Sequence, residues 1–538
     1  LLDLYNAVND THYSNADELH IVTLENMLFY DKTFNDKHTL GVTLLQSIQE
    51  DKRESVNVAM ENLPADNLKY YDLGSGLVTN TIGSAMVKWN MASFMGRINY
   101  NYLGRYLLTV SARYDGSSRL ADGHKWVLFP SAALAWRINE ESFMSSTSGW
   151  LDNLKLRLGF GKTGNSAVDP YQTKGTLSLI RYPFDNGGTP TIGYAPNAMA
   201  NSLLTWETTD QWNLGIDFGV LRGRINGTID LYMQNTHDLL LKRQLPVVSG
   251  FPDVLSNVGK TRNKGIEVSI NSMNINSKDF QWTTDLMLSS NKEEIVELYN
   301  GKNDDIGSKW FIGQPVNVHY DYRKVGIWQN TESDLAEMAK FAANGTEFAP
   351  GDIKIQDVNG DYKITDADKQ ILGNPRPKLI ASMVNTFNYK GFDLSVFLYA
   401  SFGAMLYNDM YAVEHCGRNG GVKGDYWTPN NPTNAYPRPS IDEERPIYIT
   451  STYYEKADFL RVKTMTLGYT LPKTLTNKFL VEKLRVYFTA QNPFIFTNYT
   501  GIDPEAAKVN SAGNPETNGS GFGTPSVSSW IFGINLTL

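Results

Sequence analysis

The sequence predicts an all-β chain that forms a transmembrane antiparallel β-barrel with long extracellular loops. Three observations predict this fold: an aromatic-rich composition, strand-length segments in which apolar and polar residues alternate, and short links between these segments that tend to alternate with long ones. Aromatic residues make up 12% of the 538 residues, with 29 Tyr and 11 Trp. Because aromatic side chains are enriched in strands, this is the composition of a β-protein.

Charge and cysteine content exclude several other classes. The chain has 49 Lys and Arg against 57 Asp and Glu, a net charge of −8, whereas a nucleic-acid-binding protein needs a dense cationic surface. Cys416 is the single cysteine, so internal disulfides and thiolate metal clusters are excluded. There is no run of 18 apolar residues that would predict a transmembrane helix. The mean hydropathy of −0.34 still suits a barrel, whose strands face lipid only at every second residue.

Strand-length segments recur along the chain, and each has one apolar face. Leu108 and Val110 share a face, for example, while Thr109 and Ser111 lie on the other. About ten residues of a tilted strand are enough to cross a bilayer, with alternate residues facing lipid and lumen. We therefore expect about 14 to 16 such strands. The clearest segments are 105–113, 154–161, 212–218, 392–399, 484–491 and 529–538.

The links between segments are of two kinds. Short links end in a Gly that can take a positive φ, as tight hairpins require; they are 102–104, 221–223 and 389–391. Long links are rich in Gly, Asn, Pro and Tyr; they span about 49–90, 163–205, 402–455 and 494–525. A transmembrane barrel has tight turns at one rim and large loops at the other.

A large soluble sandwich, solenoid or propeller would also alternate apolar and polar residues. The predicted inward faces, however, carry Arg, Lys, Asp and Gln in strand after strand, and a packed core does not tolerate such groups unpaired. Charged inward faces and apolar outward faces favour a water-filled lumen within lipid.

A small helical and Asp-rich insertion is expected at about 328–372. Within it, Thr331 to Ala343 has helix-forming residues, early acids and a Thr or Ser that can act as N-cap, and Asn344-Gly345 follows as a stop signal. The sequence therefore predicts one short helix in an otherwise β chain.

Residues 357–368, DVNGDYKITDAD, follow this helix and match the oxygen spacing of an EF-hand loop. Two features depart from that loop: Tyr362 stands where it has Gly, and the last position is Asp rather than Glu. The sequence predicts a structural Ca²⁺ site, with an Asx-rich turn that binds no metal as the alternative. The candidate ligands are Asp357, Asn359, Asp361, Thr365 and Asp368, with the backbone carbonyl of Lys363.

Aromatic residues gather in and beside the 402–455 link. Their rings can stack on sugars or pack against a partner, and the alternative is interface packing or an aromatic girdle around the barrel. The candidates for substrate or partner contact are Tyr407, Tyr411, Trp427, Tyr436 and Tyr448; Tyr453 and Tyr454 lie beside them. Neither an organic cofactor nor a catalytic constellation is indicated, because no acids or His/Cys pair are placed for catalysis.

A series of short strings, taken in order, resembles the SusC/RagA family of TonB-linked outer-membrane transporters. The resemblance covers nearly all of the chain from about residue 20. Its strings include YDGSSR at 114–119, GKTGN at 161–165, WETT at 206–209, NVG at 257–259, NKGIE at 263–267, GDI at 351–353, LGY at 467–469, QNP at 491–493 and GIDPE at 501–505.

This resemblance implies a 22-stranded barrel in the bacterial outer membrane, a plug domain, energy from TonB and a SusD-like surface lipoprotein as partner. It further implies import of oligosaccharides or, in some members, peptides. The 538 residues contain no segment expected to be a plug or TonB box, so 1–538 is expected to be the C-terminal portion of such a barrel.

Two other functions are weighed against this one. A siderophore or cobalamin receptor of the same energy-coupled class is disfavoured by the strings and by the long Tyr-rich loops. A surface carbohydrate-binding β protein without transport is disfavoured by the charged residues that recur on one face of the predicted strands.

Overall fold

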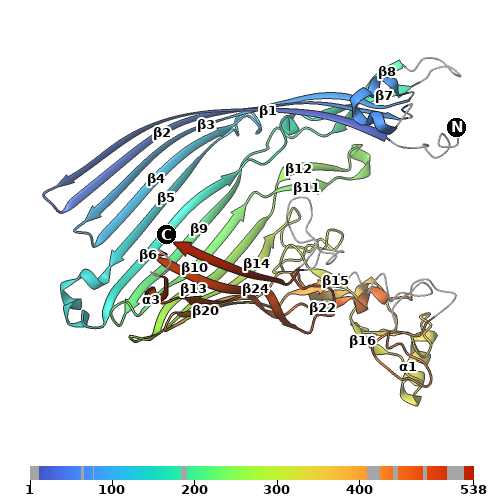
Figure 1. The fold of residues 1–538 in the computed structure, drawn as a ribbon. Coiled ribbons are helices and arrows are strands. Elements are labelled where there is room, and N and C mark those ends of the chain that lie inside the picture. Colours follow the sequence, from blue (N-terminus) through green and yellow to red (C-terminus); the bar gives the residue numbers. More distant parts are fainter. Residues whose placement is uncertain are drawn as a thin grey trace. The chain divides into compact units, whose positions relative to one another are not determined.

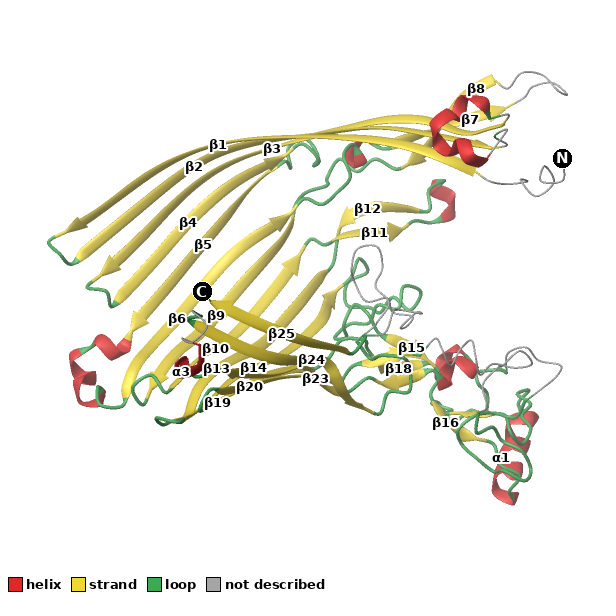
Figure 2. Ribbon diagram, viewed as in Figure 1, coloured by secondary structure: helices red, strands yellow, loops and turns green. Residues whose placement is uncertain are grey.

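The computed structural model describes residues 11–61, 63, 66–76, 78–182, 191–408, 424–439, 446–476, 481–505 and 526–537. Strands dominate this part of the chain, and the helices are few and short (Figure 2). The all-β prediction is therefore confirmed. None of the helices in these ranges is both long and apolar enough to cross a membrane.

Fifteen strands form one sheet, in the order β1-β2-β3-β4-β5-β6-β9-β10-β13-β14-β19-β20-β23-β24-β25 (Figure 1). The count agrees with the 14 to 16 strands expected from the sequence. Their bounds are β1 Thr11–Phe34, β2 His38–Glu61, β3 Val78–Tyr102, β4 Tyr106–Ser117, β5 Trp126–Arg137, β6 Leu151–Asn165, β9 Glu207–Val220, β10 Ile225–His237, β13 Lys260–Asn276, β14 Phe280–Glu297, β19 Leu379–Tyr389, β20 Phe392–Phe402, β23 Phe459–Thr470, β24 Lys483–Thr497 and β25 Ser529–Thr537.

The other described strands pair two by two within the links. They are β7 Thr176–Tyr182 with β8 Thr191–Ala198, β11 Leu240–Gln244 with β12 Asp253–Asn257, β15 His319–Asp321 with β18 Gln370–Gly373, β16 Lys324–Ile327 with β17 Ile353–Ile355, and β21 Met405–Tyr407 with β22 Tyr454–Lys456. The described helices include α1 Glu332–Ala343, α3 Lys473–Thr476, and the 3₁₀ turns η2 Asp66–Ser75, η5 Gln172–Lys174, η7 Asp366–Asp368 and η9 Ile449–Thr452.

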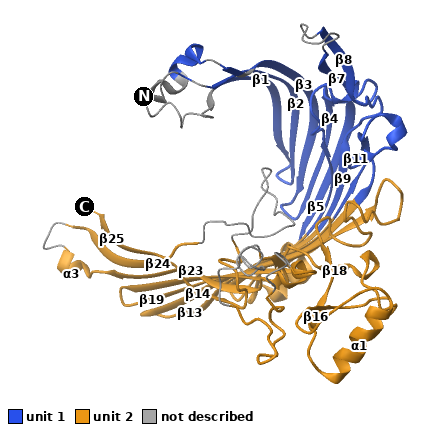
Figure 3. Cartoon of the chain, turned by 90° about the vertical axis from the view of Figure 1, so that its right-hand side faces the viewer, with its two compact units in different colours: residues 1–137, 157–213, 234–260 blue, residues 138–156, 214–233, 261–538 orange. Residues whose placement is uncertain are grey.

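The chain divides into two compact units (Figure 3). Unit 1 comprises residues 1–137, 157–213 and 234–260, and unit 2 comprises 138–156, 214–233 and 261–538. Unit 1 has a core of Leu120, Phe129, Leu204 and Trp206 beside its strands. Unit 2 has its cores among the links that follow β14 and β20.

The predicted tight turns are confirmed. Leu103 and Gly104 have φ of 56° and 69°, and the backbone N–H of Arg105 donates to the Tyr102 carbonyl at 3.0 Å. Positive φ at successive turn residues matches the twist of the flanking strands. Lys390 and Gly391, with φ of 46° and 91°, form the same kind of turn between β19 and β20.

The prediction of a long link at about 49–90 is wrong. β2 continues to Glu61 and β3 begins at Val78, so that the link is only 62–77. Residues 50–54 (EDKRE) gave the segment loop character, yet their charges pair across strands: Lys88 Nζ lies 2.8 Å from Glu50 Oε1, and Arg53 Nη2 lies 3.1 Å from Asp17 Oδ2. Strand residues that carry charged groups on both faces show no apolar alternation, which is why the pattern failed here. The other three long links begin and end close to the predicted positions.

The two faces of the strands differ as the sequence predicted. On β4, Leu108 and Val110 are 39% and 43% exposed, whereas Thr109 and Ser111 are half-buried. On β25, Phe532 is 81% exposed. The opposite faces carry paired polar groups, such as Ser111 and Ser131, whose hydroxyl oxygens lie 2.7 Å apart. Apolar side chains are thus presented outward and polar ones are satisfied on the other face, as in a sheet surrounded by lipid.

Helix α1 is confirmed close to its predicted bounds, over Glu332–Ala343. Thr331 is its N-cap, and the Thr331 hydroxyl accepts a hydrogen bond from the Asp334 backbone N–H at 3.3 Å. The helix ends at Ala343 with Asn344 as its C-cap, as the Asn-Gly signal predicted.

Candidate functional site

Two links of unit 2 fold together, and we call them the loop domain: residues 298–378, between β14 and β19, with 403–408, 424–439 and 446–458, between β20 and β23. Side chains tie the two links to each other. Trp427 Nε1 donates to Gln329 Oε1 at 2.9 Å, the Ile327 backbone N–H donates to Asn434 Oδ1 at 2.9 Å, and Lys324 Nζ donates to the Ala435 carbonyl. These two links are therefore one packed structure rather than independent segments.

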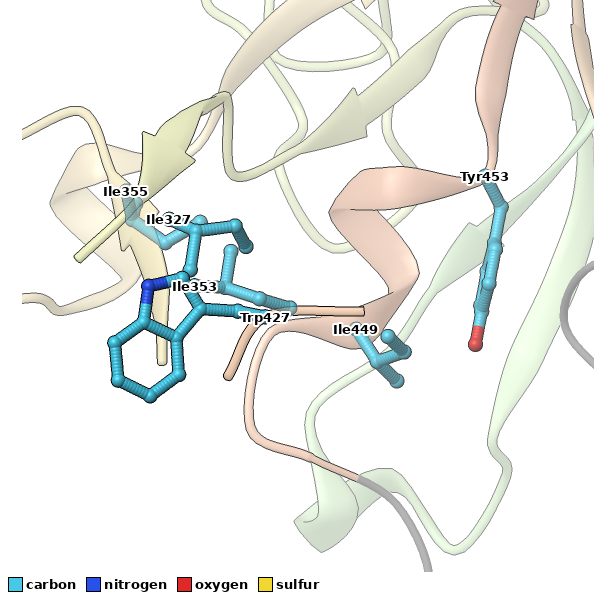
Figure 4. Close-up of a cluster of buried hydrophobic side chains, with 6 residues drawn as sticks. All are labelled: Ile327, Ile353, Ile355, Trp427, Ile449 and Tyr453. Atoms are coloured by element: carbon cyan, nitrogen blue, oxygen red, sulfur yellow. The ribbon is translucent and has the colours of Figure 1, made fainter. Parts of the chain in front are cut away.

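The first core of the loop domain draws on both links (Figure 4). Its buried side chains are Ile327, Ile353, Ile355, Trp427, Ile449 and Tyr453. β16 supplies Ile327 and η9 supplies Ile449, while Ile353 and Ile355 alternate along β17 so that both point inward. Trp427 is only 6% exposed. Its ring therefore stabilises the loop domain.

The second core holds helix α1. Trp328 is fully buried with Met338 and Phe341, and Phe348 and Tyr362 pack against them. The rings of Phe341 and Tyr362 meet edge to face at 5.5 Å, a favourable arrangement of aromatic quadrupoles. The helix is thereby fixed against residues 357–368, the acidic loop, which contains Tyr362.

A cavity of about 530 Å³ opens in the loop domain, beside these two cores. This volume lies within the range of small-molecule sites. Its walls come from three segments: Gly345, Thr346, Glu347, Phe348, Ala349, Asp352 and Ile353; Ile364; and Pro437, Arg438, Pro446, Ile447 and Tyr448.

The cavity combines aromatic rings with a half-exposed ion pair. Phe348 and Tyr448 have ring centroids 6.4 Å apart. Arg438 Nε donates to Asp352 Oδ1 at 2.9 Å, and Asp352 Oδ2 also accepts the Ala349 backbone N–H at 2.7 Å. Tyr448 has a φ of 65°, an unusual backbone conformation for a residue other than Gly, Asn or Asp. An aromatic wall with a fixed guanidinium–carboxylate pair can bind a polar ligand that has an apolar face.

Burial changes the titration of groups around the cavity. Burial, helped by the Asp366 carboxylate, raises the pKa of Tyr322 to about 12, and Tyr322 packs edge to face on Tyr448 at 5.0 Å. Burial also raises the pKa of Tyr448, with a further contribution from Asp368. Both phenols are therefore neutral hydrogen-bonding groups at ordinary pH. Burial lowers the pKa of Lys324 to about 8.

The acidic loop lies against the second core and is held by its own backbone. Asp357 Oδ1 and Oδ2 accept the N–H groups of Gly360 and Tyr362, each at 2.8 Å. Asp368 is fully buried, and its carboxylate accepts the Val358 and Thr365 N–H groups at 2.9 and 2.8 Å. Asp368 therefore joins the two ends of the loop.

In this arrangement the carboxylate oxygens of the loop accept hydrogen bonds from the loop itself. Tyr362 has a φ of 56°, so it takes a left-handed conformation at the position where the EF-hand requires Gly. Asn359 and Asp361 bond to each other, Asp361 Oδ1 also accepts the Lys363 N–H, and Thr365 caps η7. Within the described ranges no three His, Cys, Asp or Glu side chains are grouped so as to hold a metal ion. The Ca²⁺ site stays a prediction.

The aromatic residues singled out in the sequence occupy different places. Tyr407 packs edge to face on Tyr453 and Tyr454, with centroids 5.5 and 5.3 Å away. Tyr436 is half-buried, and its carbonyl accepts the Trp427 N–H at 3.0 Å. Of the four candidates that the structure describes, only Tyr448 lines the cavity; Tyr411 lies outside the described residues.

Sequence reasoning missed Phe348, Arg438 and Asp352. The one available signal was the string GDI at 351–353, where Gly351 has a φ of 94° and an added Cβ would lie 2.5 Å from the Trp427 ring. That glycine lets the chain turn between the two cores. Its neighbour Asp352 is thereby placed against Arg438, a residue 86 positions away.

Comparisons with known proteins agree with this architecture. Residues 3–493 match the family described as TonB dependent receptor-like, beta-barrel. The chain is 32% identical to TonB-dependent receptor P3 of Formosa agariphila over 531 residues, which is 95% of the chain and 52% of that protein. It is 35% identical to TonB-dependent receptor SusC of Bacteroides thetaiotaomicron over 434 residues, 77% of the chain and 41% of SusC.

Among solved structures, the RagAB peptide transporter superposes on 98% of the chain and 56% of the matched chain, with a TM-score of 0.80 and 23% identity. This likeness concerns the fold. The chain spans about half the length of the curated relatives it matches.

Proposed function

The chain belongs to the TonB-dependent receptor-like β-barrel family of the bacterial outer membrane, and on that premise we propose that it provides barrel wall and extracellular loops for an importer of oligosaccharides or peptides. The importer moves its substrate without altering it chemically. TonB supplies the energy, and a SusD-like surface lipoprotein captures substrate with it.

One observation carries the proposal. Outward strand faces present apolar side chains such as Leu108, Val110 and Phe532, while the opposite faces carry paired polar groups. Lys155 of β6, for example, lies 3.4 Å from Asp217 of β9. A wall that is apolar toward lipid and charged toward its lumen supports passage of a hydrophilic cargo.

The nature of the cargo is inferred from the loop domain. Its cavity offers the rings of Phe348 and Tyr448 beside the Arg438–Asp352 pair, groups that suit sugar rings with hydroxyls or short peptides. SusC, at 35% identity, supports an importer that works with a surface lipoprotein. The siderophore or cobalamin alternative has no comparable support in these residues.

Uptake by host cells tests the proposal. Deleting the gene for the intact protein should abolish uptake of its labelled oligosaccharide or peptide, and deleting TonB should do the same with the protein still in the membrane. Mild detergent extraction should co-purify a surface lipoprotein. Normal uptake in cells that lack TonB would contradict the proposal.

A further inference from the structure

A second cavity, of about 580 Å³, lies in unit 1. Its walls come from β3 near Lys88 and Trp89, from the link that follows β4, and from the segment around η5. Lys88 and Trp89 lie in the middle of β3, just beyond Met91, where the pairing with Ser117 at the end of β4 stops, and away from the tight turn at Leu103 and Gly104. The cavity therefore lies beyond the end of β4, on the side away from the tight turns.

The floor of this cavity is held in place by core packing and hydrogen bonds. Leu120 and Ala121 are buried in the core of unit 1. The Asn90 N–H donates to Ser118 Oγ at 2.8 Å, and the Ser118 N–H donates to the Asn90 carbonyl at 3.0 Å. Trp206 Nε1 donates to the Lys125 carbonyl at 2.8 Å. The lining segments are therefore held in place by core contacts and backbone hydrogen bonds.

Two aromatic side chains belong to the wall. The Arg119 guanidinium lies 3.8 Å from the Trp89 ring centroid, which fixes this ring. Tyr171 is 47% exposed, has a φ of 71°, and accepts the Lys88 N–H on its hydroxyl at 3.2 Å. The cavity thus presents an accessible ring next to a rigid one.

The charge of the wall contrasts with that of the chain. Lys88, Lys125 and Lys174 line the cavity together with a single acid, Asp122, whereas the chain carries a net charge of −8. Lys88 pairs with Glu50 at 2.8 Å and Lys125 with Asp122 at 2.5 Å, and all four side chains are well exposed. Lys174 has no ion pair among the described residues. Exposed pairs are weak, so a ligand anion can replace these carboxylates.

We propose that this cavity binds an acidic oligosaccharide, in which sulfate or uronate groups meet the lysines and a pyranose ring packs on Tyr171. Lysines around a cavity favour anions, and the aromatic wall favours the apolar face of a sugar over a small inorganic anion. The inference rests on the proposed import function and narrows its substrate class.

Binding to the intact transporter, purified with its partner, tests this site. The probes are a glucan oligosaccharide in its sulfated and unsulfated forms, an oligogalacturonate of equal length, and a polyglutamate peptide. We expect the two acidic sugars to bind more tightly than the neutral one, with affinity falling as salt rises. Each of K88Q, K125Q and K174Q should weaken acidic-sugar binding roughly two- to fivefold, and the triple variant tenfold or more.

K242Q is the matched control, because Lys242 is also an exposed lysine of unit 1 paired with a carboxylate, Asp253 at 3.8 Å. K242Q should leave binding of the acidic sugars unchanged. The substitutions at Lys88, Lys125 and Lys174 should leave binding of the neutral sugar unchanged. Equal binding by the triple variant and the native protein would overturn the site. Tight polyglutamate binding, lost in the same variants, would overturn the sugar assignment. Sugar binding without uptake would contradict the transport proposal while leaving this site intact.

Discussion

Arg485 on β24 and Asp393 on β20 form an ion pair across the strand that separates them. Arg485 Nε donates to Asp393 Oδ1 at 2.9 Å, although β23 lies between their strands. Gly468 of β23 is paired with Asp393 in register. A Cβ added to Gly468 would lie 2.5 Å from Arg485 Nη2 and 2.6 Å from Asp393 Oδ1. The missing side chain therefore lets three strands be joined by one polar contact.

We predict that Gly468→Ala weakens the sheet at this point. The added methyl group must displace the guanidinium or the carboxylate, and overpacking of this kind costs about 1–3 kcal/mol. The free energy of unfolding, measured in detergent by the heat-dependent gel mobility typical of barrels, should fall accordingly. Gly159→Ala is the control: its Cβ would lie 4.0 Å from its nearest neighbour, Asn213 Cβ. Equal effects of the two substitutions would show that the Arg485–Asp393 pair can relax.

The outward apolar face of the strands predicts that an added charge destabilises the protein more on that face than on the opposite face. Leu158 of β6 is 47% exposed, and Leu158→Arg should cost about 2–4 kcal/mol if the residue lies near the bilayer midplane. Gly159→Arg, one position along on the inward face, should cost far less because that face already carries charged groups. The amount of folded protein in the outer-membrane fraction reports the difference. Equal tolerance at both positions would refute the assignment of faces.

The acidic loop makes a prediction about divalent cations. If Asp357, Asp361 and Asp368 bind Ca²⁺ with the millimolar or submillimolar Kd of extracellular sites, a concentration 100 times that Kd should stabilise the loop domain by about 2.7 kcal/mol. Protease resistance of the loop domain in Ca²⁺ and in chelator measures this. Asp357→Asn should abolish the difference. A loop domain that is equally resistant in both conditions would leave the loop as an Asx-rich turn.

Lys324 predicts that the loop domain becomes more stable at alkaline pH. Its pKa falls from the ordinary 10.5 to about 8 on burial, so between these values the unfolded chain binds more protons than the folded one. Stability from this group is therefore greatest above pH 10.5 and is lost as pH falls toward 8. Hydrogen exchange at Ile327 and Ala435 should slow from pH 8 to pH 9.5, after correction for the intrinsic rate, and Lys324→Met should remove this trend.

The comparison must stay below about pH 10. Tyr322, whose pKa burial raises to about 12, acts in the opposite sense above pH 10, because the unfolded chain then loses its tyrosine proton first. A Lys324→Met variant with the same trend as the native protein would show that another group is responsible.

The strands and tight turns could be predicted because their signals are local. Period-two alternation identified β4 and β25, and the Gly at 104 or 391 identified the turns beside them. The loop domain could not be predicted, because its contacts join residues far apart in the chain: Trp427 bonds to Gln329, 98 positions away. The same limit explains the wrong prediction at residues 50–54. Their charges favour a loop, because their ion-pair partners on neighbouring strands cannot be identified from the sequence.

The shared cores of the loop domain bear on how its specificity could be redesigned or exchanged between relatives. Residues 298–378 supply Ile327, Ile353 and Ile355, while 424–439 and 446–458 supply Trp427, Ile449 and Tyr453. Grafting either stretch alone from a homologue would set foreign side chains against native ones in a close-packed interior. The two stretches therefore constitute a single cassette, and a chimera that alters cargo preference should transfer both at once.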